Sequence, residues 1–241
     1  MSDEFKAAVM AVPMAPAPES ATRLGMLWTA FAERRSAVAA LVVCALLLTA
    51  ALLAPWIAPQ NPYDLAVIDM FDSRLPPGSV NAAGFTYWLG TDGQGRDMLS
   101  AMLYGLRLSL LVGVMSGVLA IGVGVSLGLM AAYFGRFVDA MIMRVVDFML
   151  GFPTILVALM LLAVLGQGVD KVIFALIVVQ WAYFARAVRG TAMIERSKEY
   201  VDAAVSLNLG RPRIIFGHIL PNCLPPIIVI GTMQVAHAIS T

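Results

Sequence analysis

The stretch Leu108–Phe134 reads LSLLVGVMSGVLAIGVGVSLGLMAAYF and contains no charged residue. A helix needs about 20 such residues to cross the hydrocarbon core of a bilayer, so this stretch predicts a transmembrane helix. At about 100° per residue, four glycines share one face of that helix: Gly113, Gly117, Gly124 and Gly128. Small residues let a neighbouring backbone approach closely. We expect this stripe to pack against another helix of the same chain; a contact with a second subunit or the pore is the alternative.

Four more apolar runs cover residues 36–53, 137–165, 172–188 and 224–238, and Pro153 lies inside the second of these. Hydrophobic residues make up 60% of the chain and charged residues 13%, and the mean hydropathy is +0.85. A soluble domain is about half apolar and a quarter charged. A core that could bury this excess does not fit into 241 residues. The sequence therefore predicts an all-α polytopic membrane protein with about five transmembrane helices.

The polar segments between the runs indicate how the chain is organised. Residues 1–34 begin with an Ala/Pro/Met-rich stretch and are interpreted as a cytoplasmic tail. Arg34 and Arg35 precede the first run, which also fits a signal peptide, but the run is long enough for an uncleaved span. Prolines end that run and open a polar segment, residues 55–105, which we interpret as a loop outside the membrane.

The distribution of basic residues predicts the orientation. If the N-terminus is inside, 12 of the 16 Lys and Arg residues fall on the cytoplasmic side. By the positive-inside rule, residues 55–105 are then extracytoplasmic and residues 190–217 form a cytoplasmic segment. The four basic residues on the outer side are Arg74, Arg96, Arg107 and Lys171.

Composition argues against several classes of function. The net charge of +1 gives no support for a nucleic-acid partner. Cys44, Cys223, His218 and His237 are isolated from one another in the sequence, so we expect no metal site and no cofactor. None of the lysines follows a glycine, so the sequence contains no G-x-x-x-x-G-K-[ST] phosphate loop. We therefore do not expect this chain itself to be the ATPase.

The cytoplasmic segment 190–217 combines charged residues with apolar residues at helical spacing, which predicts short helices along the membrane surface. Asn208 and Gly210 both tolerate left-handed backbone, so a helix is expected to end there. Pro212 suits the start of the next helix. An ordinary interfacial loop is the alternative interpretation.

This segment resembles the cytoplasmic signature of ABC importer permeases, in which E-A-A is followed by Gly four residues later and L-P about a dozen residues on. The matching residues here are Asp202, Ala203, Ala204, Asn208, Leu220 and Pro221. Asp in place of Glu keeps the charge, and Asn in place of Gly suits a left-handed turn. The flanking residues Glu199, Tyr200, His218 and Asn222 resemble the oligopeptide/dipeptide branch.

A second motif of that branch, L-G-T-D-x-x-G-R-D, is matched in the extracytoplasmic segment. The residues concerned are Gly90, Thr91, Asp92, Gly95, Arg96 and Asp97. They could contact a binding protein or gate the outer mouth. The alternative, which we favour, is a capped helix start in which Asp92 or Thr91 accepts backbone N–H bonds and Arg96 is paired locally.

The resemblance runs from about residue 30 to the end and implies the C-type permease subunit of a binding-protein-dependent importer in the bacterial inner membrane. The family continues through a sixth span, so we expect the last span to be missing from a chain that stops at Thr241. The implied partners are membrane lipid, a second permease, two cytoplasmic ATPase subunits and an extracytoplasmic binding protein. Substrates of the branch include dipeptides, oligopeptides, nickel complexes and some sugars.

The resemblance also implies that the loop around 199–213 docks into an ATPase cleft as a coupling helix, with Ala203 and Ala204 at the contact. A proton- or sodium-coupled transporter and a scaffold protein are the rival interpretations. The first would need ionisable residues at mid-membrane. Arg144 and Asp147, near the inner end of the third span, are expected to snorkel or pair.

Overall fold

The computed structural model describes residues 23–64, 66 and 68–240, so most of the predicted tail lies outside the described residues. The chain divides into two units, 1–50 and 51–241. Helix α2 (Arg23–Ala32), which the sequence analysis did not predict, lies in the first unit. Helix α3 (Arg35–Ile57) is the first predicted span; it continues past Pro55, which was expected to end it.

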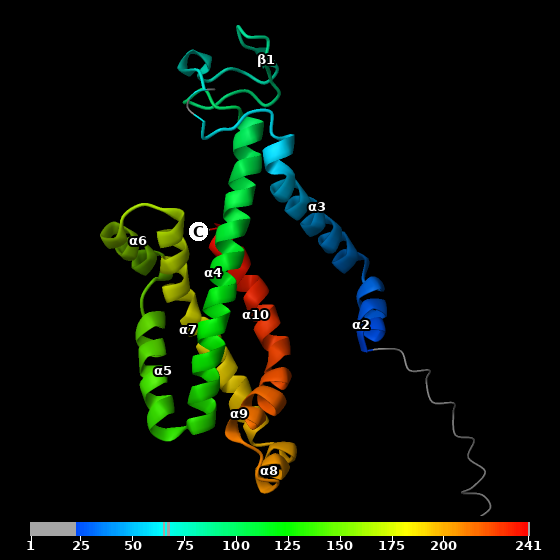
Figure 1. Ribbon diagram of the computed structural model, residues 1–241, viewed down its shortest axis with the longest axis vertical. Helices are drawn as coiled ribbons and strands as arrows, with labels where there is room; N and C mark the ends of the chain where they lie inside the picture. The colour runs from blue at the N-terminus through cyan, green and yellow to red at the C-terminus, as the bar shows by residue number, and fades with distance from the viewer. Residues whose placement is uncertain (1–22, 65, 67, 241) are drawn as a thin grey trace, which may run out of the picture. The chain divides into compact units, whose positions relative to one another are not determined.

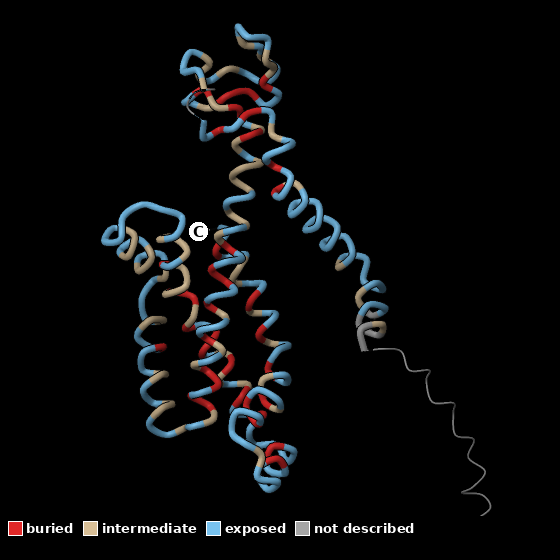
Figure 2. Tube along the Cα trace, in the orientation of Figure 1, coloured by how far each residue is buried: buried red, intermediate tan, exposed pale blue. Residues whose placement is uncertain are grey.

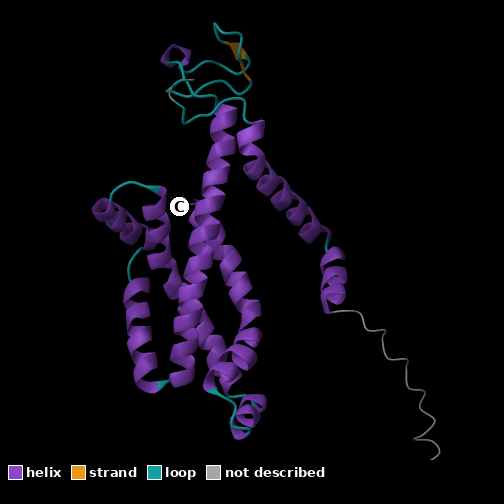
Figure 3. Ribbon diagram, viewed as in Figure 1, coloured by secondary structure: helices purple, strands orange, loops and turns teal. Residues whose placement is uncertain are grey.

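The second unit is mainly helical, and its longest non-helical segment is the polar loop that precedes α4 (Figure 3). Its long helix α4 (Met98–Phe134) forms its largest interface with α7 (Val169–Arg196) and its next largest with α10 (Leu220–Ser240). Figure 1 shows these helices running alongside one another. The remaining helices are α5 (Arg136–Leu150), α6 (Thr154–Leu165), α8 (Glu199–Ser206) and α9 (Arg211–Ile214), and a single π-helical turn, η2 (Ile215–Ile219), joins α9 to α10.

Within the described residues, four helices are long and apolar enough to cross a membrane, or five if the pair α5–α6 counts as one span. The all-α polytopic prediction is therefore confirmed. The third span was expected to be one helix, but α5 and α6 meet at an angle of 89°. The break falls at Gly151–Pro153, where proline lacks an N–H donor and disfavours helical backbone in the residue before it.

The glycine stripe of α4 packs against helices of the same chain, as predicted. All four glycines are buried, and Figure 2 shows the buried positions following the inner faces of the bundle. A Cβ atom added at Gly124 would lie 2.5 Å from Cβ of Phe184 on α7, and one at Gly117 would lie 2.8 Å from Val235 on α10. Side chains at these positions would push the helices apart.

The loop between α3 and α4 contains the 3₁₀ turn η1 (Met70–Asp72) and two short strands, β1 (Ser79–Val80) and β2 (Thr86–Tyr87). The strands are antiparallel, with Ser79 opposite Tyr87. The polar composition predicts a loop here but not its strands, since strands of two residues leave no periodic signal.

Candidate functional site

Helix α8 lies between the end of α7 and the start of α9, in the segment predicted to be cytoplasmic. Its first turn carries Glu199 and Asp202, and acidic side chains stabilise a helix N-terminus through the helix dipole. Its inner face buries Val201 and Ala204. They join a core cluster drawn from α4, α7, α8, α9, η2 and α10, whose members are Leu129, Ala132, Val188, Ala192, Val201, Ala204, Ile214, Ile215, Ile219, Cys223 and Ile227.

The two alanines of the signature face opposite ways. Ala203 is exposed, whereas Ala204 is only 3% exposed. The expectation that both alanines sit at a partner contact is therefore wrong for Ala204, which packs inside its own chain. The sequence could not separate them, because both are small and adjacent. The outer face adds two exposed apolar side chains, Val205 and Leu207.

The turn after α8 is made by Asn208, whose φ of 54° is left-handed, as predicted. Its N–H donates to the carbonyl of Val205 at 2.9 Å, and the N–H of Leu209 donates to that of Ala204 at 3.2 Å. These bonds satisfy carbonyls at the helix end. Gly210, which also tolerates left-handed backbone, does not use it here, since its φ is −59°. Pro212 lies in the first turn of α9, as predicted.

A hydrogen-bond network ties α8 to the ends of α7 and α10. The buried carboxylate of Glu195 accepts a bond from the Tyr200 hydroxyl at 2.8 Å and another from Lys198 Nζ at 2.7 Å. The amide of Asn222 donates to the carbonyl of His218 at 2.7 Å and to the Tyr200 hydroxyl at 3.3 Å. The structure thus brings together residues from both halves of the signature.

Burial, together with the neighbouring Glu195 carboxylate, raises the pKa of Tyr200 to about 12. The phenol is therefore neutral at physiological pH and keeps the proton that it donates. Glu195 was missed by sequence reasoning, in which it was only one of the charged residues of the amphipathic segment 190–217. Its position near the end of α7 and just before Lys198 was the available signal.

The other predicted signature residues are less constrained. Leu220 packs against the core cluster, while Pro221 is exposed in the first turn of α10. Glu199 and Asp202 are exposed, and they give α8 an acidic edge beside its apolar outer face. A small, partly apolar and rigidly held surface is the kind that fits a groove on another protein.

The motif in the segment predicted to be extracytoplasmic makes a locally bonded turn, which fits the alternative that we favoured. Asp92 accepts bonds from the backbone N–H groups of Gln94 at 2.8 Å and Arg96 at 3.0 Å, and from Arg96 Nε at 2.7 Å. Burial opposes ionisation of Asp92, but the bonds from Arg96 prevail and hold its pKa below the usual range. The buried Thr91 hydroxyl accepts a bond from the Leu75 N–H at 2.8 Å.

We expected Asp92 or Thr91 to cap this helix start, but the residue that caps α4 is Asp97. Its buried carboxylate accepts bonds from Ser100 N at 2.8 Å and Ser100 Oγ at 2.6 Å. Its N–H donates to Gln60 Oε1 at 3.0 Å, a partner that lies too far along the sequence for local patterns to reveal. Capping here explains why α4 begins at Met98, before the predicted start at Leu108.

Gly90 and Gly95 of the motif have φ values of 79°, and a Cβ at either position would overlap a backbone carbonyl, that of Leu75 or Asp69 respectively. Most of the motif is therefore needed to fold the loop. Only Asp92 and Arg96 among its six residues are partly exposed.

Ion pairs join α5 to α7. Arg189 and Asp139 form a two-pronged pair in which Arg189 Nη2 lies 2.6 Å from Asp139 Oδ2, and Arg186 pairs with Asp147. Asp147 thus pairs across helices rather than with Arg144, which is exposed. Paired charges of opposite sign reduce the cost of placing ionisable groups in an apolar helix.

Comparison with known proteins assigns the chain to a family. Residues 124–241 match the family described as binding-protein-dependent transport system inner membrane component. Residues 22–77 match the N-terminal transmembrane domain of oligopeptide transport permease C.

The dipeptide transport system permease protein DppC of Escherichia coli is 40% identical over 224 residues, covering 92% of this chain and 73% of that protein. The di/tripeptide permease DppC of Pseudomonas aeruginosa is 36% identical, covering 88% and 69%. The glutathione permease GsiD of Pectobacterium atrosepticum is 35% identical, covering 89% and 68%. The chain belongs to the oligopeptide/dipeptide family of permease subunits of binding-protein-dependent importers, which are multi-pass proteins of the bacterial inner membrane.

Proposed function

We propose that this permease subunit carries di- or tripeptides, or short peptides of similar chemistry, and that α8 couples the transport to ATP hydrolysis by a partner subunit. The names of the relatives support the substrate class, since they transport dipeptides, di/tripeptides and glutathione. The observation that carries the coupling role is the two-faced structure of α8. Its inner face is buried in the chain, and its outer face is exposed and partly apolar.

Force applied to α8 would reach the membrane helices through two routes. Val201 and Ala204 pack into a cluster shared with α4, α7 and α10. The bonds from Tyr200 to Glu195 and from Asn222 to Tyr200 link α8 to the last turn of α7 and the first turn of α10. Because packed cores deform little, displacement of α8 would shift these helix ends with it.

The full assembly that we propose contains a second permease subunit, two cytoplasmic ATPase subunits and an extracytoplasmic binding protein. In this assembly residues 55–105 lie on the extracytoplasmic side, where the binding protein docks, and residues 190–217 lie on the cytoplasmic side, facing the ATPases. The domain division is then a tail, residues 1–34, followed by a transmembrane domain, residues 35–241. The excess of basic residues in the inner segments supports this orientation.

Reconstitution tests the function. The chain is incorporated into vesicles with its partners, and uptake of a labelled dipeptide is measured in the presence of ATP or a non-hydrolysable analogue. We expect uptake only with ATP and with the binding protein present. Uptake driven equally well by an ion gradient without ATP would refute the proposal.

A further inference from the structure

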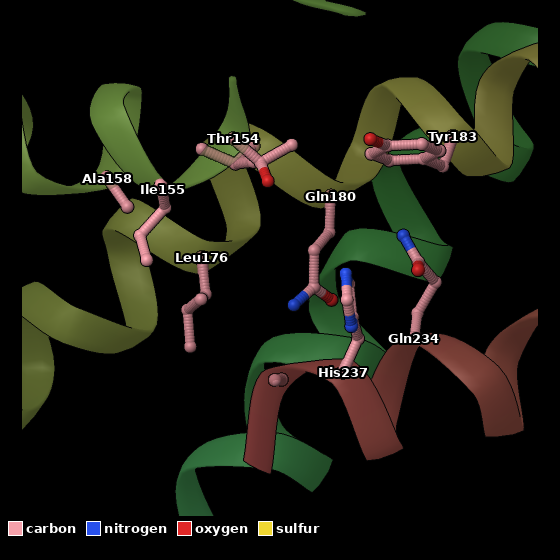
Figure 4. A pocket seen from close by; sticks show the side chains of 10 residues that line it. Thr154, Ile155, Ala158, Leu176, Gln180, Tyr183, Gln234 and His237 are labelled. Carbon is pink, nitrogen blue, oxygen red and sulfur yellow. The ribbon is translucent and has the colours of Figure 1, made fainter. Parts of the chain in front are cut away.

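A small cavity of about 30 Å³ lies between α6, α7 and α10, in the membrane-spanning part of the bundle (Figure 4). Its apolar wall is formed by residues including Ile155, Ala158 and Leu176. Five polar side chains from the three helices complete the lining: Thr154, Gln180, Tyr183, Gln234 and His237. In Figure 4 the side chains of Gln180, Gln234 and His237 project into the same space.

Gln180 is the unusual member of this group. It is only 6% exposed, and its Oε1 atom has no hydrogen-bond partner among the described residues. On α7 it lies in the uncharged stretch between Lys171 and Arg186, which places it at the depth of the hydrocarbon core. An amide oxygen left unpaired in such a place is costly. Its position therefore points to a hydrogen-bond donor that the described residues, as they are arranged here, do not supply.

The chemistry of the lining limits what that donor can be. Amide, hydroxyl, phenol and imidazole groups are present, but of the described residues that line the cavity none is Asp, Glu, Lys or Arg. A full charge would therefore find no opposite charge to pair with. The volume suits one group about the size of a water molecule. A water molecule meets both conditions, and the N–H group of a peptide bond lying beside the cavity meets the first, because it is a neutral donor.

We propose that Gln180 Oε1 accepts a hydrogen bond from the backbone N–H of a peptide in transit, and that a water molecule occupies the cavity between passages. The inference rests on the proposed function and names a contact for its substrate. Every peptide without proline offers such an N–H whatever its side chains are. Recognition of this kind would let one permease accept many short peptides while rejecting solutes that lack an amide donor.

The test combines a change in the protein with a change in the ligand. Uptake is measured in the reconstituted assembly for a labelled dipeptide and for the same dipeptide methylated on its peptide nitrogen, which removes the donor. Wild type is compared with Gln180→Leu, which has a similar shape and no acceptor. The binding protein is the same in both assemblies, so its own response to methylation cancels in the comparison. Gln167→Leu, which removes an exposed amide ahead of α7, is the matched control.

We expect Gln180→Leu to assemble normally and to raise the KM for the dipeptide by about tenfold. Methylation should weaken uptake about tenfold more in wild type and in Gln167→Leu than in Gln180→Leu. Equal sensitivity to methylation in all three proteins would overturn the contact. If Gln180→Leu assembles poorly, its remaining uptake is still compared for the two dipeptides, and a wild-type preference for the unmethylated one would also overturn the contact. If the wild-type assembly takes up no peptide at all, the proposed function itself fails, and the assignment of this cavity fails with it.

Discussion

Ala204→Arg should destabilise the folded chain, whereas Ala203→Arg should leave its stability nearly unchanged, although the two residues are adjacent. Ala204 is 3% exposed and packs among the apolar side chains shared by α4, α7 and α10. Overpacking such a site costs about 1–3 kcal/mol, and an unpaired buried charge adds roughly 3 kcal/mol or more. Ala204→Arg should therefore lose on the order of 4–6 kcal/mol, enough to detach α8 from the bundle. Ala203→Arg places its charge in solvent, where a substitution costs within about 0.5 kcal/mol.

Two measurements separate these effects. Thermal unfolding of the purified chain in detergent should show a large loss of stability for Ala204→Arg and little change for Ala203→Arg. Capture of the ATPase subunit should then fail for Ala203→Arg although the chain is intact, because the bulky charge covers the outer face of α8. If Ala204→Arg unfolds like wild type, the burial of α8 against the bundle is refuted. If Ala203→Arg captures the ATPase normally, the outer face is not the docking surface.

Three further tests, which use five substitutions, concern other parts of the structure. Gly124→Leu should prevent α4 from packing on α7 and lower the yield of folded chain. Gly122→Leu is the control and should be tolerated, because a Cβ at that position meets nothing within 4 Å. Equal yields of the two variants would contradict this packing. Asn208→Gly should change the free energy of unfolding, measured in urea, by less than about 1 kcal/mol. Asn208→Val should lower it by about 1–2 kcal/mol, because a left-handed φ disfavours a β-branched side chain. Equal effects of the two substitutions would argue against this turn. Tyr200→Phe should leave one oxygen of the buried Glu195 carboxylate without its donor and cost about 1–3 kcal/mol by the same assay, and an unchanged midpoint would show that water replaces the hydroxyl.

The features that the sequence predicted are those controlled by local composition. Long apolar runs predicted the spans, and the spacing of glycines predicted which face of α4 is buried. Asn208 could be placed in a left-handed turn because few residue types tolerate that conformation.

The features that were missed depend on contacts between distant parts of the chain. The composition of residues 137–165 is that of a single span, and nothing in its apolar pattern gives the direction in which α6 leaves Pro153. Ala203 and Ala204 are identical in chemistry, so only the packing of α8 distinguishes them. Gln60 and Asp97 meet across 37 positions, a distance over which sequence patterns carry no pairing information.

Cross-linking from the outer face of α8 tests the central claim most directly. In a background where Cys44 and Cys223 are replaced by Ala, a single cysteine is introduced at Ala203, or at Val80 as the control in the loop before α4. In membranes that contain the assembled transporter, Ala203→Cys should cross-link to the ATPase subunit and resist an impermeant thiol reagent applied from outside. Val80→Cys should react with that reagent and yield no ATPase cross-link. A cross-link from Val80→Cys to the ATPase, together with outside labelling of Ala203→Cys, would contradict both the orientation and the coupling role of α8.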